Sequence, residues 1–239
     1  MKHNSKINLL IMVVVLLSGC AASGPAPRGS NIDELPMYGG MDRKSDPSLR
    51  EADETLIAGV TKEFGSPAKA SQAFVDQGIR YYQVDNYSMA MKRFNQAWLL
   101  DDKNPQSYWG MGQVLYKRHE DDQGLKMLEK AYDLAPENAR LLVDLGYGYA
   151  AKGRAYFLNN DAPSAELLHK AEQLFAKART MEPDYGPLYM AWASARYWQR
   201  DFAGAWDMVR QARKLGAENA LDPAFLSDLK TRMPDPDVK

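Results

Sequence analysis

The sequence of 239 residues contains a single cysteine, Cys20, and this scarcity excludes a framework of disulfide bonds within the chain. The residues that follow Cys20 are numerous enough for one large domain or a small array of repeats. We therefore expect the stability of the folded protein to come from packing alone.

Long hydrophobic runs are also absent. The apolar run from Leu9 to Leu17 is well short of the roughly 20 residues that a membrane-spanning helix needs, and no later stretch is long enough either. We therefore predict no transmembrane helix.

The sequence has no excess of positive charge, because 30 Lys and Arg residues stand against 31 Asp and Glu residues. Proteins that bind nucleic acid usually carry a basic patch or stripe. The charge balance therefore argues against nucleic acid as a partner.

Histidine is rare, and the motifs of common catalytic sites are missing. His119 lies in the run His119-Glu120-Asp121-Asp122, which could ligate a metal but fits a solvated polar turn better. The sequence contains no HExxH, no GxSxG and no phosphate-binding glycine loop. We predict no catalytic residue, no metal and no cofactor, and we expect that the protein is not an enzyme.

The N-terminus has the organisation of a secretory signal peptide. Lys2 and Lys6 precede the apolar run, and small residues precede the cysteine in Leu17-Ser18-Gly19-Cys20. This tetrapeptide resembles the lipobox of bacterial lipoproteins. The resemblance implies that residues 1–19 are removed and that Cys20 carries lipid, such as palmitate.

The resemblance also implies a location. In lipoproteins of Gram-negative bacteria an aspartate after the acylated cysteine favours the inner membrane, and this chain has Ala21. We expect a lipid anchor in the outer membrane and a protein that faces the periplasm. Residues 21–30 are small and rich in Pro and Gly, as in a tether, so residues 20–45 are predicted to be a linker and extended segment. Without Lys2 and Lys6, 28 positive charges remain against 31 negative, a net charge of about −3.

Small residues recur with a fixed period along the rest of the chain. Gly78, Gly112 and Gly146 are 34 residues apart, and Ala193 takes the corresponding place in a fourth unit, after a third unit that is 13 residues longer. A bulky residue precedes each by four positions, namely Phe74, Tyr108, Leu142 and Tyr189. This period and pattern resemble the tetratricopeptide repeat (TPR) family, in which each unit is a pair of antiparallel helices.

The resemblance covers residues 71–215 and implies an all-α fold, a solenoid of four helical hairpins. The third unit, residues 139–184, is longer than the family pattern, and we expect helices over 139–158 and 163–181 with a turn between them. The extra length is either a simple insertion or a docking protrusion, and Tyr156 and Phe157 near its tip favour docking.

Two helices outside the repeats are predicted to cap the array, over residues 46–66 and 222–233. We expect a disordered tail at 234–239. Residues 31–43 are too apolar for a simple tether and show no period, so the sequence does not predict their position.

In TPR arrays the first helix of each unit lines a concave groove. Counting along the four units places several aromatic side chains there, although some groove positions, such as Val75 and Val143, also fit an ordinary core. Chaperone-binding relatives hold a peptide carboxylate with Lys and Asn, which this chain lacks at those positions. The candidate partner-binding residues are Tyr82, Trp109, Gln113, Tyr116, Tyr147, Tyr197 and Trp198.

These observations predict a lipid-anchored adaptor or assembly factor of the bacterial envelope, in pilus, secretion or other envelope complexes, that binds a protein or peptide. The alternative is a peptidoglycan-binding regulator of cell-wall enzymes, because aromatic rings also stack on sugars. The sequence identifies neither the partner nor the oligomeric state.

Overall fold

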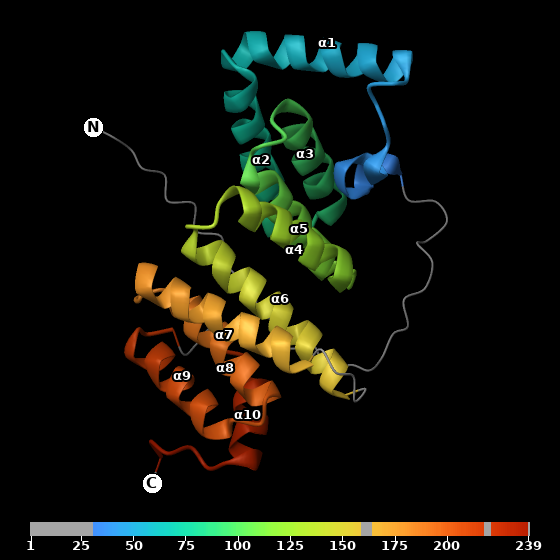
Figure 1. Ribbon diagram of the computed structural model, residues 1–239. Helices are drawn as coiled ribbons and strands as arrows, with labels where there is room; N and C mark the ends of the chain where they lie inside the picture. Colours follow the sequence, from blue (N-terminus) through green and yellow to red (C-terminus); the bar gives the residue numbers. More distant parts are fainter. Residues whose placement is uncertain (1–30, 159–163, 218–220, 239) are drawn as a thin grey trace, which may run out of the picture. The chain divides into compact units, whose positions relative to one another are not determined.

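The computed structural model describes residues 31–158, 164–217 and 221–238, and these residues form α-helices and short 3-10 turns without a β-strand (Figure 1). They divide into two compact units, residues 31–141 and residues 142–238. The all-α prediction is confirmed. None of the described helices combines the length and apolarity that a bilayer-spanning helix needs.

The N-terminal unit contains one leading helix and two hairpins. Side-chain oxygens of Asp46, Ser66, Asn86 and Asn104 accept backbone N–H bonds at the starts of the first four helices. These caps explain why each helix begins where it does. The helices are α1 (Pro47–Phe64), α2 (Pro67–Gln83), α3 (Tyr87–Leu100), α4 (Pro105–Lys117) and α5 (Asp121–Leu134).

Glycines allow these hairpins to pack closely. The ring of Phe94, 1% exposed, lies against Gly78 and Gly110, where an added Cβ would approach the ring to 2.6 Å and 2.3 Å. At Gly112 an added Cβ would lie 2.9 Å from Leu128. Gly78 and Gly112 are two of the small residues that set the predicted repeat.

The C-terminal unit contains the lengthened hairpin, a further hairpin and a final helix. Helix α6 (Ala139–Leu158) begins in the N-terminal unit and continues here, followed by α7 (Ser164–Met181). An added Cβ at Gly146 would lie 2.9 Å from Phe175, and the Ser164 hydroxyl donates to the Gly153 carbonyl over 3.0 Å. The predicted turn at 159–163 lies outside the described residues. The other helices are α8 (Gly186–Trp198), α9 (Phe202–Lys214) and α10 (Pro223–Arg232).

The turns inside three hairpins share a backbone conformation. Asp85, His119 and Arg200 have φ of 57°, 61° and 62°, in the left-handed region that non-glycine residues seldom adopt. His119 is exposed in this turn. Among the described residues no group of three or more His, Cys, Asp or Glu side chains could hold a metal ion.

Residues 31–43, which we call the strap, lie along α3 (Figure 1). The strap contains two 3-10 turns, Ile32–Glu34 and Pro36–Gly40. The amide of Asn95, fully buried on α3, accepts from the Met37 N–H at 2.8 Å. It also donates to the carbonyls of Asp33 and Leu35, at 2.7 and 2.8 Å. One side chain thus satisfies three backbone groups of a non-repetitive segment.

The strap also holds α1. Arg43 binds both carboxylate oxygens of Asp53, at 2.6 and 2.8 Å, and its guanidinium lies 4.2 Å from the ring centroid of Tyr38. Burial raises the pKa of Tyr38 to about 12, so its phenol stays protonated at neutral pH. Asp53 is the only buried residue of α1, whose apolar residues all keep part of their surface exposed.

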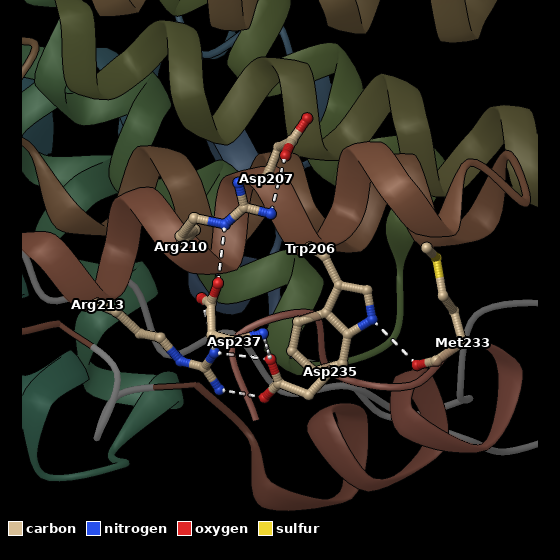
Figure 2. Close-up of polar contacts among 7 residues, drawn as sticks. All are labelled: Trp206, Asp207, Arg210, Arg213, Met233, Asp235 and Asp237. Atoms are coloured by element: carbon tan, nitrogen blue, oxygen red, sulfur yellow. Dashed lines mark hydrogen bonds and ion pairs between the residues drawn. The ribbon is translucent and has the colours of Figure 1, made fainter. Parts of the chain in front are cut away.

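The C-terminal tail is ordered up to residue 238, which differs from the predicted disorder (Figure 2). Arg213 donates to both carboxylate oxygens of Asp235, at 2.8 and 3.1 Å, and Asp237 pairs with Arg210 and Arg213 at 3.4 Å. The indole of Trp206 donates to the carbonyl of Met233 over 3.1 Å. We call Arg210, Arg213, Asp235 and Asp237 the C-terminal clamp. These ion pairs join residues that lie more than 20 positions apart in the sequence. The sequence of the tail alone therefore does not reveal them.

Candidate functional site

The predicted groove residues are divided between the two units, so each unit is described by itself. In the N-terminal unit, Tyr82, Gln113 and Tyr116 are partly exposed, whereas Trp109 keeps only 8% of its surface exposed. Val75 is fully buried, as the core alternative expects. Trp109 therefore acts here mainly as a packing residue.

The tyrosines of this unit lie against the helix that follows. The rings of Tyr82 and Tyr87 are 5.6 Å apart and tilted. The ring of Tyr116 lies where an added Cβ on Gly124 would approach it to 2.9 Å. The neighbouring polar surface includes Gln72, whose amide donates to Gln106 over 2.8 Å.

The C-terminal unit brings two predicted residues directly together. The rings of Tyr147 on α6 and Trp198 on α8 have centroids 5.3 Å apart, and both side chains are partly exposed. The guanidinium of Arg154 lies 5.3 Å from the centroid of the Trp198 ring, within the range of a cation–π contact. We call Tyr147, Arg154 and Trp198 the aromatic cluster.

Tyr197 does not join this cluster. Its ring lies 5.6 Å from both Phe202 and Phe225, and its hydroxyl bonds to the carboxylate of Asp228 on α10. The side chain therefore ties α8 to the final helix. Val143, the other residue with a core alternative, is fully buried.

The possible docking tip is only partly described. Tyr156 is partly exposed near the end of α6, and the side chain of Phe157 lies outside the described residues. Cys20 and the signal peptide at 1–19 also lie outside them.

Two residues with specific contacts, Arg154 and Asn95, were not predicted from the sequence. Arg154 follows Tyr147 by seven residues, about two turns along the same face of α6, and this spacing was the available signal. Asn95 follows the buried Phe94 on α3 and is itself a buried polar residue. Neither residue recurs at the repeat period, so the repeat pattern did not identify them.

The described residues include two histidines, and neither is one of the predicted groove residues. His169 bonds to Gln173 over 2.9 Å on an exposed face of α7, and His119 lies in a turn. Within the described part of the chain we find no arrangement of nucleophile and base. The surfaces present rings, amides and a guanidinium, which suit recognition of a partner.

Comparison with known proteins gives the fold. The sequence matches no protein-family model and no curated protein. Among solved structures, TTC0263, a thermophilic TPR protein of Thermus thermophilus, is similar, with a TM-score of 0.57 and 19% identity over 69% of this chain and 84% of that chain.

Two further structures are less similar. MamA has a TM-score of 0.49 and 16% identity, over 69% of this chain and 86% of that chain. PilF of Pseudomonas aeruginosa has a TM-score of 0.43 and 16% identity, over 77% and 93%. At these TM-scores the likeness says nothing about function. The likeness to the Thermus protein and the 34-residue repeat together show that this chain has the all-α fold of a TPR solenoid.

Proposed function

We propose that the chain is a non-catalytic adaptor or assembly factor that binds a protein or peptide partner. The observation that supports this most directly is the aromatic cluster, in which Tyr147 and Trp198 are in contact, partly exposed and flanked by Arg154. Rigid aromatic rings and arginine are the residue types that dominate binding energy at protein interfaces.

The proposal includes the location that the N-terminal sequence predicts. Lipid on Cys20 would anchor the protein in the outer membrane of a Gram-negative bacterium, with the repeats in the periplasm. The partner would then be a component of an envelope complex, such as a pilus or secretion assembly.

The test is capture of partners by the full-length protein from detergent-solubilised membranes, with crosslinking and mass spectrometry. The variant with Tyr147→Ala and Trp198→Ala should lose about 2 kcal/mol or more of binding free energy, roughly thirtyfold in affinity. Tyr132→Ala is the matched control, because Tyr132 is a partly exposed tyrosine on α5 outside the predicted groove.

Thermal melts of all variants establish that the fold is retained. Equal capture by the double variant and the parent would contradict the assignment of the site to the aromatic cluster. Loss of capture on Tyr156→Ala alone would move the site to the tip of the lengthened hairpin.

The second candidate is regulation of cell-wall enzymes through binding of glycan strands to the same rings. The partly exposed rings of Tyr147 and Trp198 favour this second candidate, because aromatic rings can stack on sugars. A pull-down with purified sacculi separates the two candidates, since the adaptor proposal expects no retention on sacculi.

A further inference from the structure

A cavity of about 220 Å³ lies between the strap and α3, and it is open to solvent. The strap contributes Asp33 and Tyr38 to its lining. The residues from α3 are spaced by three and four, so they share one helix face, and they are Met89, Lys92, Arg93 and Gln96. The cavity belongs to the N-terminal unit alone and shares no residue with the predicted groove.

Several hydrogen-bond donors at this cavity lack partners within the described residues. Lys92 forms an ion pair with Glu34, which lies outside the lining, with Nζ and Oε1 3.7 Å apart, and no shorter contact to an acceptor is described for its ammonium group. The hydroxyl of Tyr38 and the amide nitrogen of Gln96 also make none. Because the cavity is open, solvent or a ligand can accept hydrogen bonds from these donors.

Arg93 is held in place without being neutralised. It donates to Gln96 over 2.8 Å, and its guanidinium lies 5.6 and 6.0 Å from the rings of Phe74 and Tyr81. Its Nε is shielded from solvent and has no hydrogen-bond partner among the described residues. Since no described carboxylate pairs with Arg93, its positive charge is available to a ligand.

Donors outnumber acceptors at the cavity, because Lys92, Arg93, Gln96 and Tyr38 can donate whereas Asp33 offers the only carboxylate of the lining. The complementary group is an anionic acceptor, and a carboxylate accepts from Lys and Arg in strong, charge-assisted bonds. Met89 and the Tyr38 ring supply an apolar wall for methylene groups.

The size of the cavity indicates the source of that carboxylate. About 220 Å³ is the volume of roughly seven waters and lies below the range of about 300–1,000 Å³ typical of pockets for whole small molecules. We propose that the cavity binds a glutamate or aspartate side chain of a protein partner, held by Lys92 and Arg93. This site is additional to the aromatic cluster and does not depend on it.

Asp33 allows a test in which two substitutions should change the binding affinity in opposite directions. Its carboxylate lines the same cavity and repels an incoming carboxylate, so removing its charge should strengthen binding. Removing the charge of Lys92 should weaken it. A purely structural role for these residues would not predict opposite changes in affinity.

The experiment titrates the full chain with two blocked hexapeptides that differ only in a central glutamate or glutamine. The Gln96 side-chain amide resonance in NMR reports on the cavity. We expect the glutamate peptide to shift this resonance, Lys92→Met to weaken its binding about tenfold, and Asp33→Asn to strengthen it severalfold. Lys126→Met, on the exposed face of α5, should leave it unchanged.

Equal affinity for the two peptides, no shift with either, or no response to Lys92→Met in a variant that melts like the parent would overturn the proposal. Free glutarate that binds more tightly than the glutamate peptide, with the same response to both variants, would overturn the side-chain source and indicate a small-acid site instead.

Discussion

At the scale of single residues, the phenyl ring of Phe94 couples two successive hairpins. It occupies the space that side chains at Gly78 and Gly110 would otherwise fill, one glycine on α2 and the other on α4. The 34-residue period identifies Gly78, but Gly110 is two residues out of that register. The contact of Gly110 depends on how one hairpin packs on the next, which local sequence does not specify.

Gly110→Ala should destabilise the protein. The added Cβ would lie 2.3 Å from the buried Phe94 ring, and overpacking of this kind costs about 1–3 kcal/mol. Gly59→Ala on α1 is the matched control, because no atom lies within 4 Å of its added Cβ. It should be neutral or stabilise by about 0.5–1 kcal/mol. Thermal and urea unfolding measure both, and a Gly110 variant as stable as the parent would contradict the described contact.

The sequence alone could not distinguish all of the predicted binding residues from residues of the core. Trp109 and Tyr147 both fall on groove positions by count, yet Trp109 is 8% exposed and Tyr147 is partly open. Register gives the direction of a side chain from its helix. It does not give the depth to which neighbouring residues cover that side chain.

At the scale of elements, the strap and the C-terminal clamp are non-repetitive segments held by specific polar contacts. Sequence periodicity predicted the helices that form hairpins, including a lengthened third hairpin whose helices the structure places at Ala139–Leu158 and Ser164–Met181. The strap and the tail have no period, and their contacts with Asn95 and Arg213 join residues distant in sequence. That is why the sequence predicted neither arrangement.

Asn95→Ala should release the strap. The substitution leaves the Met37 N–H and the Asp33 and Leu35 carbonyls without their partner, and each lost bond contributes about 1 kcal/mol. We expect faster hydrogen exchange and proteolysis within residues 31–43, measured by mass spectrometry. Gln83→Ala, at an exposed position of α2 outside the cavity, should leave both rates unchanged. Unchanged protection of the strap in the Asn95 variant would show that the other contacts suffice to hold it.

The clamp should make stability depend on pH. Hydrogen bonds from Arg213 lower the pKa of Asp235, whose side chain is 4% exposed, below its unfolded value of about 3.9. A depressed folded-state pKa contributes stability that is fully present above the unfolded value and is lost as the pH falls through the folded value.

Asp235→Asn should therefore lower the free energy of unfolding by about 1.5–3 kcal/mol at pH 7, because bonds to a charged group are lost. The difference from the parent should shrink below pH 4. Urea unfolding across pH 2–7 measures it, with Asp133→Asn, an exposed aspartate on α5, as control. If the difference in unfolding free energy between the variant and the parent does not change with pH, the charge of Asp235 is not its cause.

At the scale of the whole molecule, repeat and anchor were both recognisable in the sequence, but only the repeat lies in described residues. The fixed 34-residue spacing means that the same close contact between paired helices recurs in successive units. A few glycines were therefore enough to predict the fold. The predicted lipobox would act as a processing signal, so a chemical experiment tests it.

Cys20→Ala should abolish acylation and leave the precursor uncleaved. The reason is the tetrapeptide Leu17-Ser18-Gly19-Cys20, in which the thiol of Cys20 is the only one in the chain. Metabolic labelling with a fatty acid and fractionation of membranes measure the outcome. Equal labelling of variant and parent would refute the lipoprotein prediction.

The strap also determines how the molecule bears force. Among the described residues, the strap comes first in the chain, so tension applied from its N-terminal side reaches the strap before it reaches α1. The contacts that resist this tension follow one another along the strap. They are the hydrogen bonds of the Asn95 amide, the bond from Arg118 to the Glu34 carbonyl and the ion pair between Arg43 and Asp53. Extension from this side is therefore expected to detach the strap from α3 before it loads α1.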